Sequence, residues 1–200
     1  MTHYFQTPHG EEKLHDVTAT IWGDDYRFTS AAGVFSSARL DPGTSVLFRL
    51  TQPPIDRPAR FLDLGCGFGA IGLALAAQCP SAEVDAVDVN DRALSLTRRN
   101  ARRMNLADRV HTFRPEQCPQ GTRYDEIWSN PPIRIGKQAL HDLLTCWLAR
   151  LKPDGRAMLV VSKNLGADSL QTWLESQGWQ TDRYGSAKGF RVLQVRPGQD

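Results

Sequence analysis

The chain has 200 residues, of which 40% are hydrophobic and 23% charged, and its formal net charge is +2 at pH 7. This length is typical of one α/β domain and short for two, and the composition excludes wholesale disorder. The small positive charge does not by itself indicate a nucleic-acid partner, so such a partner must be argued from a site. The chain shows no signal-peptide layout, no apolar run of about 20 residues and no metal-ligand spacing of Cys and His. We therefore expect a cytoplasmic protein without a membrane partner or a metal.

Residues 1–57 hold mixed polar and aromatic sequence, and we expect them to form an N-terminal extension that helps cover the ligand site, with a helix over 44–50 that is capped by Thr44. From residue 58 to residue 200 the hydrophobic pattern predicts strands that alternate with helices. The expected strands are 60–64, 83–89, 110–113, 126–128, 157–161, 180–184 and 191–195, and the expected helices are 71–77, 92–104, 138–151 and 169–177. This order predicts an α/β, Rossmann-like fold with a mainly parallel seven-stranded sheet and an antiparallel edge hairpin.

A glycine-rich loop follows the first of these strands, in the run Asp63-Leu64-Gly65-Cys66-Gly67-Phe68-Gly69. Glycines at this place let the backbone bend sharply and let a ligand come close, although a tight turn without a ligand is the alternative reading. The dinucleotide fingerprint has its third glycine where Ala70 stands here. A carboxylate at Asp63 would repel a pyrophosphate but suits an ammonium group. The loop therefore favours a nucleoside that carries an amino acid over NAD.

Asp88 ends the second strand, where a carboxylate can accept hydrogen bonds from both hydroxyls of a ribose. NAD enzymes use an acid in the same way, so Asp88 indicates a ribose without identifying the cofactor. The alternative role is that of an acid at the start of a helix. Asp85 lies in mid-strand, and we expect it to be structural or on an exposed edge.

The fourth strand ends in Ser129-Asn130-Pro131-Pro132-Ile133. Two prolines cannot continue a central strand, and Pro131 keeps Asn130 extended. The Asn130 side chain and the backbone carbonyl of Pro131 are both acceptors, so together they can hold both hydrogens of an exocyclic –NH₂ group. Such a pair would leave the nitrogen lone pair facing a methyl donor, which is catalysis by positioning. The alternative reading is a turn that only ends the strand.

In the segments 63–69, 88–90 and 130–133 and in Asn100, the chain resembles class I S-adenosylmethionine-dependent methyltransferases. The runs 26–29, 33–36 and 41–44 resemble the start of the methyltransferase small domain group. Within that group the chain is most similar to the small-subunit ribosomal RNA guanine-N2 methyltransferases, in their single-domain form. The run from Asn130 to Lys137 and the opening His3-Tyr4-Phe5 carry this similarity.

The resemblance implies S-adenosylmethionine as cofactor and assigns a role to each motif. Asp63, Gly65, Gly67 and Gly69 would line the methionine and ribose side, Asp88 would bind the ribose, Val89 would contact the adenine, and Glu116 would lie near its amino group. Asn130 and Pro131 would hold the target amine, with Pro132 and Ile133 beside the substrate. Ile133 stands where many relatives have an aromatic residue that stacks on a flipped base, so Phe35 or Phe190 is expected to supply that face.

The expected partner is ribosomal RNA or the small ribosomal subunit. Arg134, Lys137 and Lys163 follow the strands that end at the ligand edge, and we expect them to contact phosphates unless they are ordinary surface charges. Two other functions are consistent with the sequence. One is N-methylation of a glutamine amide in a protein, and the other is RNA binding by a domain that has lost catalysis.

Overall fold

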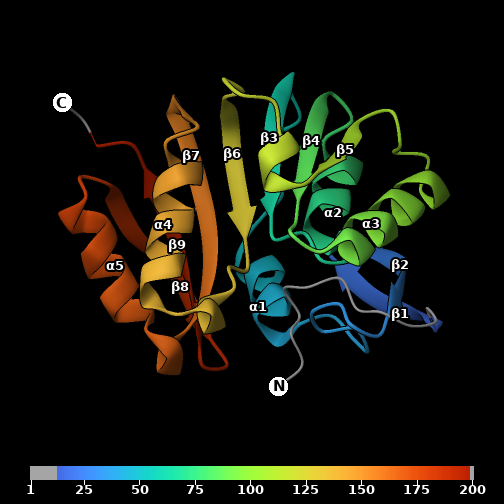
Figure 1. Ribbon diagram of the computed structural model, residues 1–200, viewed down its shortest axis with the longest axis horizontal. Coiled ribbons are helices and arrows are strands. Elements are labelled where there is room, and N and C mark those ends of the chain that lie inside the picture. The colour runs from blue at the N-terminus through green and yellow to red at the C-terminus, as the bar shows by residue number, and fades with distance from the viewer. Residues whose placement is uncertain (1–12, 199–200) are drawn as a thin grey trace.

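The computed structural model describes residues 13–198, and its centre is a seven-stranded sheet (Figure 1). The strand order is β5-β4-β3-β6-β7-β9-β8. The strands are β3 (Ala59–Leu64), β4 (Ala82–Val87), β5 (Val110–Phe113), β6 (Tyr124–Ser129), β7 (Leu151–Ser162), β8 (Gln180–Ala187) and β9 (Phe190–Arg196). The first five run parallel, and β9 is antiparallel to both β7 and β8. The Rossmann-like α/β fold with its antiparallel edge hairpin is confirmed.

Five α-helices accompany the strands in this part of the chain. They are α1 (Pro42–Leu50), α2 (Ala70–Gln78), α3 (Asp91–Arg103), α4 (Lys137–Leu148) and α5 (Ala167–Ser176). Figure 1 shows α4 and α5 over one half of the sheet and α2 and α3 over the other. Phe61 and Leu62 belong to two different hydrophobic clusters, because successive residues of a strand point to opposite faces. Both faces of the sheet are therefore buried, as expected for continuous apolar strands.

The N-terminal region contains a hairpin that the sequence did not predict, formed by β1 (Leu14–Ile21) and β2 (Asp24–Ala31). Its two-residue turn has positive φ at both Trp22 (52°) and Gly23 (95°), which is the requirement of a tight hairpin turn. The backbone N–H and C=O of Thr29 both bond to the buried Asn100 side chain of α3, which fixes the hairpin to the main domain. The boundary expected between residues 57 and 58 stays a prediction.

Several expected elements have other limits in the structure. Helix α1 begins at Pro42 instead of residue 44, because Asp41 is its cap and accepts from the backbone N–H groups of Gly43 and Thr44. Helix α4 ends at Leu148 instead of residue 151, and β7 begins at Leu151 instead of residue 157. β7 pairs with β6 at Leu151 and again from Arg156, with a register shift between them, and a Cβ on Gly155 in this irregular stretch would lie 3.0 Å from three backbone carbonyl oxygens.

Between residues 13 and 198, no helix has both the length and the apolar character needed to cross a membrane. The same part of the chain contains no group of three His, Cys, Asp or Glu side chains arranged to hold a metal ion.

Candidate active site

The candidate site lies where β3 and β6 meet, at the point where the strand order reverses. Leu64 and Ser129 are register partners at the ends of these strands, and the Ser129 hydroxyl donates to the Leu64 carbonyl over 2.6 Å. The loop of residues 65–69, called the glycine loop below, therefore begins beside Asn130. In open α/β sheets this edge is where ligands bind. The two strongest motifs of the sequence are thus adjacent in space.

The three glycines of the loop have positive φ, at 79° for Gly65, 57° for Gly67 and 91° for Gly69. A Cβ on Gly65 would meet nothing within 4 Å, and one on Gly67 would meet only Val34 at 3.9 Å, so both border open space. A Cβ on Gly69 would lie 2.9 Å from the Thr97 side chain of α3. The first two glycines thus leave room for a ligand, whereas the third allows the loop to pack on α3.

Asp63 is fully buried just before the glycine loop. Its Oδ2 accepts from the backbone N–H of Gly72 over 2.8 Å, and its Oδ1 has no partner among the described residues. Burial raises the pKa of this carboxyl to about 7, although the Gly72 hydrogen bond lowers it. A buried acceptor without a partner is costly, and an ammonium group of a ligand would satisfy it. The residue therefore fits the amino-acid end of S-adenosylmethionine.

Asp88 connects the glycine loop to the start of α3. Its Oδ2 accepts from the N–H of Gly67 and its Oδ1 from the N–H of Asn90, each over 2.9 Å. Burial raises the pKa of Asp88, and its backbone hydrogen bonds partly oppose that rise. Val89 follows and is 44% exposed, so an apolar side chain borders the same edge. Asp85 is fully buried and pairs with Arg60, which is the structural role considered from the sequence.

Asn130 follows β6 and is held through its amide nitrogen. Nδ2 donates to Oδ1 of Asp41 over 2.7 Å and to Oγ1 of Thr44 over 3.1 Å. Within residues 13–198 no donor contacts its Oδ1. The Pro131 carbonyl accepts from the N–H of Ile133 over 2.8 Å and keeps a second lone pair. Two acceptors at this turn therefore remain able to receive hydrogen bonds.

A small cavity of about 40 Å³ separates the glycine loop from the N-terminal segment. Its lining includes Gly65, Gly67 and Asn130 on one side and Phe35, Asp41 and Thr44 on the other. Sequence reasoning used Asp41 only as part of a run that resembles the family and Thr44 also as a helix cap, so it missed both as site residues. The capping pattern was the one local signal, and it did not indicate contact with Asn130.

The other expected residues lie around this edge. Phe190 packs against the start of α1, since a Cβ on Gly43 would meet its ring at 3.0 Å, and Phe35 is 50% exposed. Ile133 is partly buried and packs on the α4 side of the sheet, beside Pro132. Arg134, Lys137 and Lys163 are exposed and follow β6 or β7. Glu116 is exposed after β5, with Arg114 at 3.8 Å.

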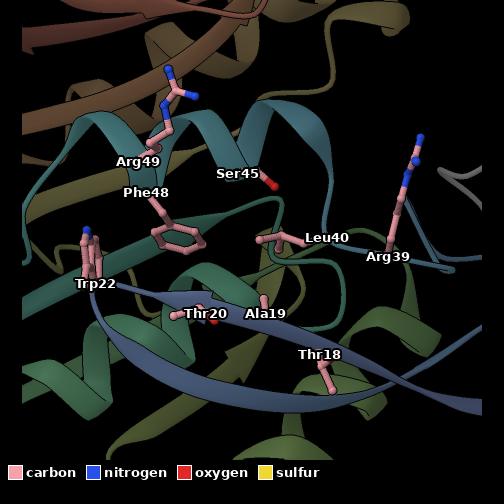
Figure 2. Close-up of a pocket in the computed structure, with 9 residues that line it drawn as sticks. All are labelled: Thr18, Ala19, Thr20, Trp22, Arg39, Leu40, Ser45, Phe48 and Arg49. Atoms are coloured by element: carbon pink, nitrogen blue, oxygen red, sulfur yellow. The ribbon is translucent and has the colours of Figure 1, made fainter.

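A larger cavity of about 490 Å³ lies between β1 and α1 (Figure 2). Trp22, Leu40 and Phe48 give it an apolar wall, while the Arg39 and Arg49 side chains point away from β1. Leu40 also lines the smaller cavity, so the two are neighbours. None of the site residues expected from the sequence lines this larger cavity.

Comparison with known proteins identifies relatives of this chain. The model of the methyltransferase small domain family matches residues 25–194. Ribosomal RNA small subunit methyltransferase C of Chromohalobacter salexigens is 33% identical over 83% of this chain and 50% of its own length. The uncharacterized protein YbxB of Bacillus subtilis is 28% identical over 97% of both chains. The chain spans half or less of the length of the ribosomal RNA methyltransferases it matches.

Solved structures agree with this family. The 16S rRNA N2 methyltransferase RsmC of T. thermophilus, in complex with AdoMet and guanosine, superposes with a TM-score of 0.79 at 26% identity. The match covers 95% of this chain and 52% of that one. A ribosomal protein L11 methylase of Lactobacillus delbrueckii shares the fold, with a TM-score of 0.66 at 20% identity. The chain belongs to the methyltransferase small domain family, and it is an S-adenosylmethionine-dependent methyltransferase.

Proposed function

We propose that this methyltransferase modifies an exocyclic amino nitrogen, and that its target is guanine N2 in small-subunit ribosomal RNA. The observation that carries the proposal is the position of Asn130, whose Nδ2 is occupied by Asp41 and Thr44 while its Oδ1 is available beside the glycine loop. A relative whose own target is N2 in 16S rRNA, solved with guanosine, supports the choice of base.

Each of the expected cofactor residues would contact a different part of S-adenosylmethionine. Asp63 would accept from the ammonium group, Gly65 and Gly67 would let the cofactor approach the backbone, and Asp88 would accept from the ribose hydroxyls. Val89 and Glu116 would border the adenine. When bound, S-adenosylmethionine supplies a methyl group that its sulfonium has already activated for attack by a nitrogen lone pair.

The chain's contribution to catalysis would be orientation of the amine. Asn130 Oδ1 and the Pro131 carbonyl would each accept one hydrogen of the –NH₂ group, which directs the lone pair out of the plane of the base. Holding two reactants in line removes much of the entropic barrier to their reaction. A strong general base is not required, because the extra proton can pass to water after the transfer.

The RNA would be held by charges and an aromatic face around the same edge. Arg134, Lys137 and Lys163 would contact phosphates, while Pro132 and Ile133 border the base. Phe35, which lines the small cavity together with Asn130, or Phe190, whose ring lies beside the start of α1, would stack on the base. Stacking on an aromatic ring would compensate for the aliphatic Ile133.

The experiment is deletion of the gene, followed by mass spectrometry of nucleosides from ribosomal RNA. We expect one N2-methylguanosine to be lost, restored by the wild-type gene and not by Asn130→Ala. Complementation with Asn164→Ala, an exposed residue outside the site, is the matched control. Loss of a methylated glutamine with unchanged RNA would instead assign a protein amide as the target. Unchanged methylation of both would indicate a domain without catalysis.

A further inference from the structure

We infer that Asp41 and Thr44 are positioning residues, which fix the orientation of the Asn130 side-chain amide and so decide which of its atoms faces the target. This inference rests on the proposed function, because it concerns how the same amine would be held. Neither residue needs to touch the substrate, since both would act through Asn130.

The first step is the chemistry of the contact between Asp41 and Asn130. Asp41 Oδ1 lies 2.7 Å from Nδ2, and a carboxylate oxygen has no hydrogen to donate. Only the –NH₂ end of the amide can therefore face Asp41. The reversed amide would bring two oxygens to this distance, with repulsion in place of a charge-assisted hydrogen bond.

The second step is that both amide hydrogens are occupied. Thr44 Oγ1 receives the other one over 3.1 Å, and Thr44 is only 6% exposed. With both donors bound to the protein, Oδ1 is the part of the Asn130 side chain left to contact a substrate. An acceptor at this place suits an –NH₂ group and would oppose a carbonyl oxygen of a base.

The third step is how Asp41 is itself held. Its Oδ1 also accepts from the N–H groups of Gly43 (2.7 Å) and Thr44 (3.2 Å) at the first turn of α1, where the helix dipole favours a negative charge. A Cβ on Gly43 would lie 2.9 Å from this oxygen and 3.0 Å from the ring of Phe190. The start of α1 is therefore packed so that one oxygen atom both caps the helix and orients Asn130.

The consequence for catalysis is specific. Without these acceptors the amide can turn by half a rotation and present –NH₂ to the target, so that donor faces donor. Cofactor binding should change little, because the residues expected to hold the cofactor belong to other segments, namely the glycine loop and its neighbours Asp63 and Asp88. The expected signature is a lower transfer rate with unchanged affinity for S-adenosylhomocysteine.

Two pairs of variants test the inference. Thr44→Val removes one acceptor and leaves the Asp41 cap, and we expect it to lower the single-turnover rate on ribosomal RNA about three- to tenfold. Asp41→Ala removes the other and should lower the rate at least about tenfold. Thr44→Ser and Asp41→Asn keep an acceptor oxygen and should restore most of each loss. Ser45→Val, an exposed position in the same turn of α1, controls for changes in the helix itself.

A second readout is independent of methyl transfer. In the nitrogen–proton NMR spectrum, the Asn130 amide should show two separate protons with slow solvent exchange, and Thr44→Val should speed exchange where Thr44→Ser does not. If the Asn130 amide protons exchange slowly in a wild-type protein that does not methylate RNA, the proposed substrate is wrong and the positioning role still holds. Wild-type rates in both Thr44→Val and Asp41→Ala would overturn the positioning role alone. The positioning role would also be overturned if these variants lost S-adenosylhomocysteine affinity as strongly as they lost rate, since that pattern indicates a purely structural role.

Discussion

The Ser129 hydroxyl donates a hydrogen bond of 2.6 Å to the carbonyl oxygen of Leu64, and this contact joins the ends of the two central strands. Both residues are buried, and each directly precedes a functional segment, the glycine loop in one case and Asn130 in the other. The separation between the cofactor residues and the target residue is therefore set by one strand register and one side-chain hydrogen bond.

Replacing Ser129 by Ala should leave the Leu64 carbonyl without this buried donor and lower the free energy of unfolding by about 1–3 kcal/mol. Urea denaturation of wild type and variant measures this difference. Ser162→Ala, at the end of the neighbouring β7, is the control and should change stability by less than about 0.5 kcal/mol. Equal unfolding midpoints for Ser129→Ala and wild type would mean that the register holds without the hydroxyl.

Asp63 should make cofactor binding depend on pH. Burial raises its pKa from 3.8 to about 7, and an ammonium group binds the carboxylate form, so S-adenosylhomocysteine affinity should rise as the pH rises through about 7. Asp63→Asn should bind more weakly and lose this dependence. Calorimetry between pH 6 and pH 8.5 measures both, and a wild-type affinity that does not change with pH would exclude Asp63 as the ammonium acceptor.

The same shift has a consequence for the ligand-free fold. Because the folded pKa lies above the unfolded value, the folded state keeps a proton that the unfolded state has lost between pH 3.8 and about 7. The stability contributed by Asp63 is therefore complete below pH 3.8 and is lost as the pH rises through about 7. The wild-type curve of unfolding free energy against pH, minus that of Asp63→Asn, should fall across this window.

The site could be predicted from the sequence wherever its signals were local. Asp63 lies near the end of β3, and the glycine loop, Asp88 and Asn130 each follow a strand directly, so the alternation of strands and helices was sufficient to bring them to one edge. The hydrogen bond from Asn130 to Asp41 joins residues that are 89 positions apart, and no local sequence pattern at either residue predicts it. The β1–β2 hairpin was missed for a similar reason, because its exposed face is polar and its stability comes from packing on α3.

The cations that follow β6 and β7 should contribute to RNA binding. Replacing Arg134, Lys137 and Lys163 together by Ala should raise the Michaelis constant for RNA and flatten its dependence on salt, because fewer counterions are released on binding. Arg99, Arg102 and Arg123 are also exposed, and their triple Ala variant removes the same charge elsewhere. A larger effect in this control set would place the RNA surface on α3 and the segment before β6.

Asn130→Asp should be almost as inactive as Asn130→Ala above neutral pH. Its second oxygen would stand where Nδ2 now lies, 2.7 Å from the Asp41 carboxylate, and two ionised carboxylates at this distance repel each other. A proton shared between them would restore a donor toward Asp41, so the rate of this variant relative to wild type should rise as the pH falls. The ratio of single-turnover rates between pH 6 and pH 9 measures the effect. A ratio that is flat across this range would contradict the contact with Asp41.

The central claim is that the Asn130 amide holds the target amine, and single-turnover transfer of a labelled methyl group to ribosomal RNA tests it most directly. We expect Asn130→Ala to keep the fold and its affinity for S-adenosylhomocysteine, and to transfer the methyl group on the order of a hundredfold more slowly than wild type. Asn164→Ala, prepared and measured in parallel, should transfer at the wild-type rate. If Asn130→Ala transfers as fast as wild type, Asn130 does not hold the amine, and the prolines that follow it serve only to end β6.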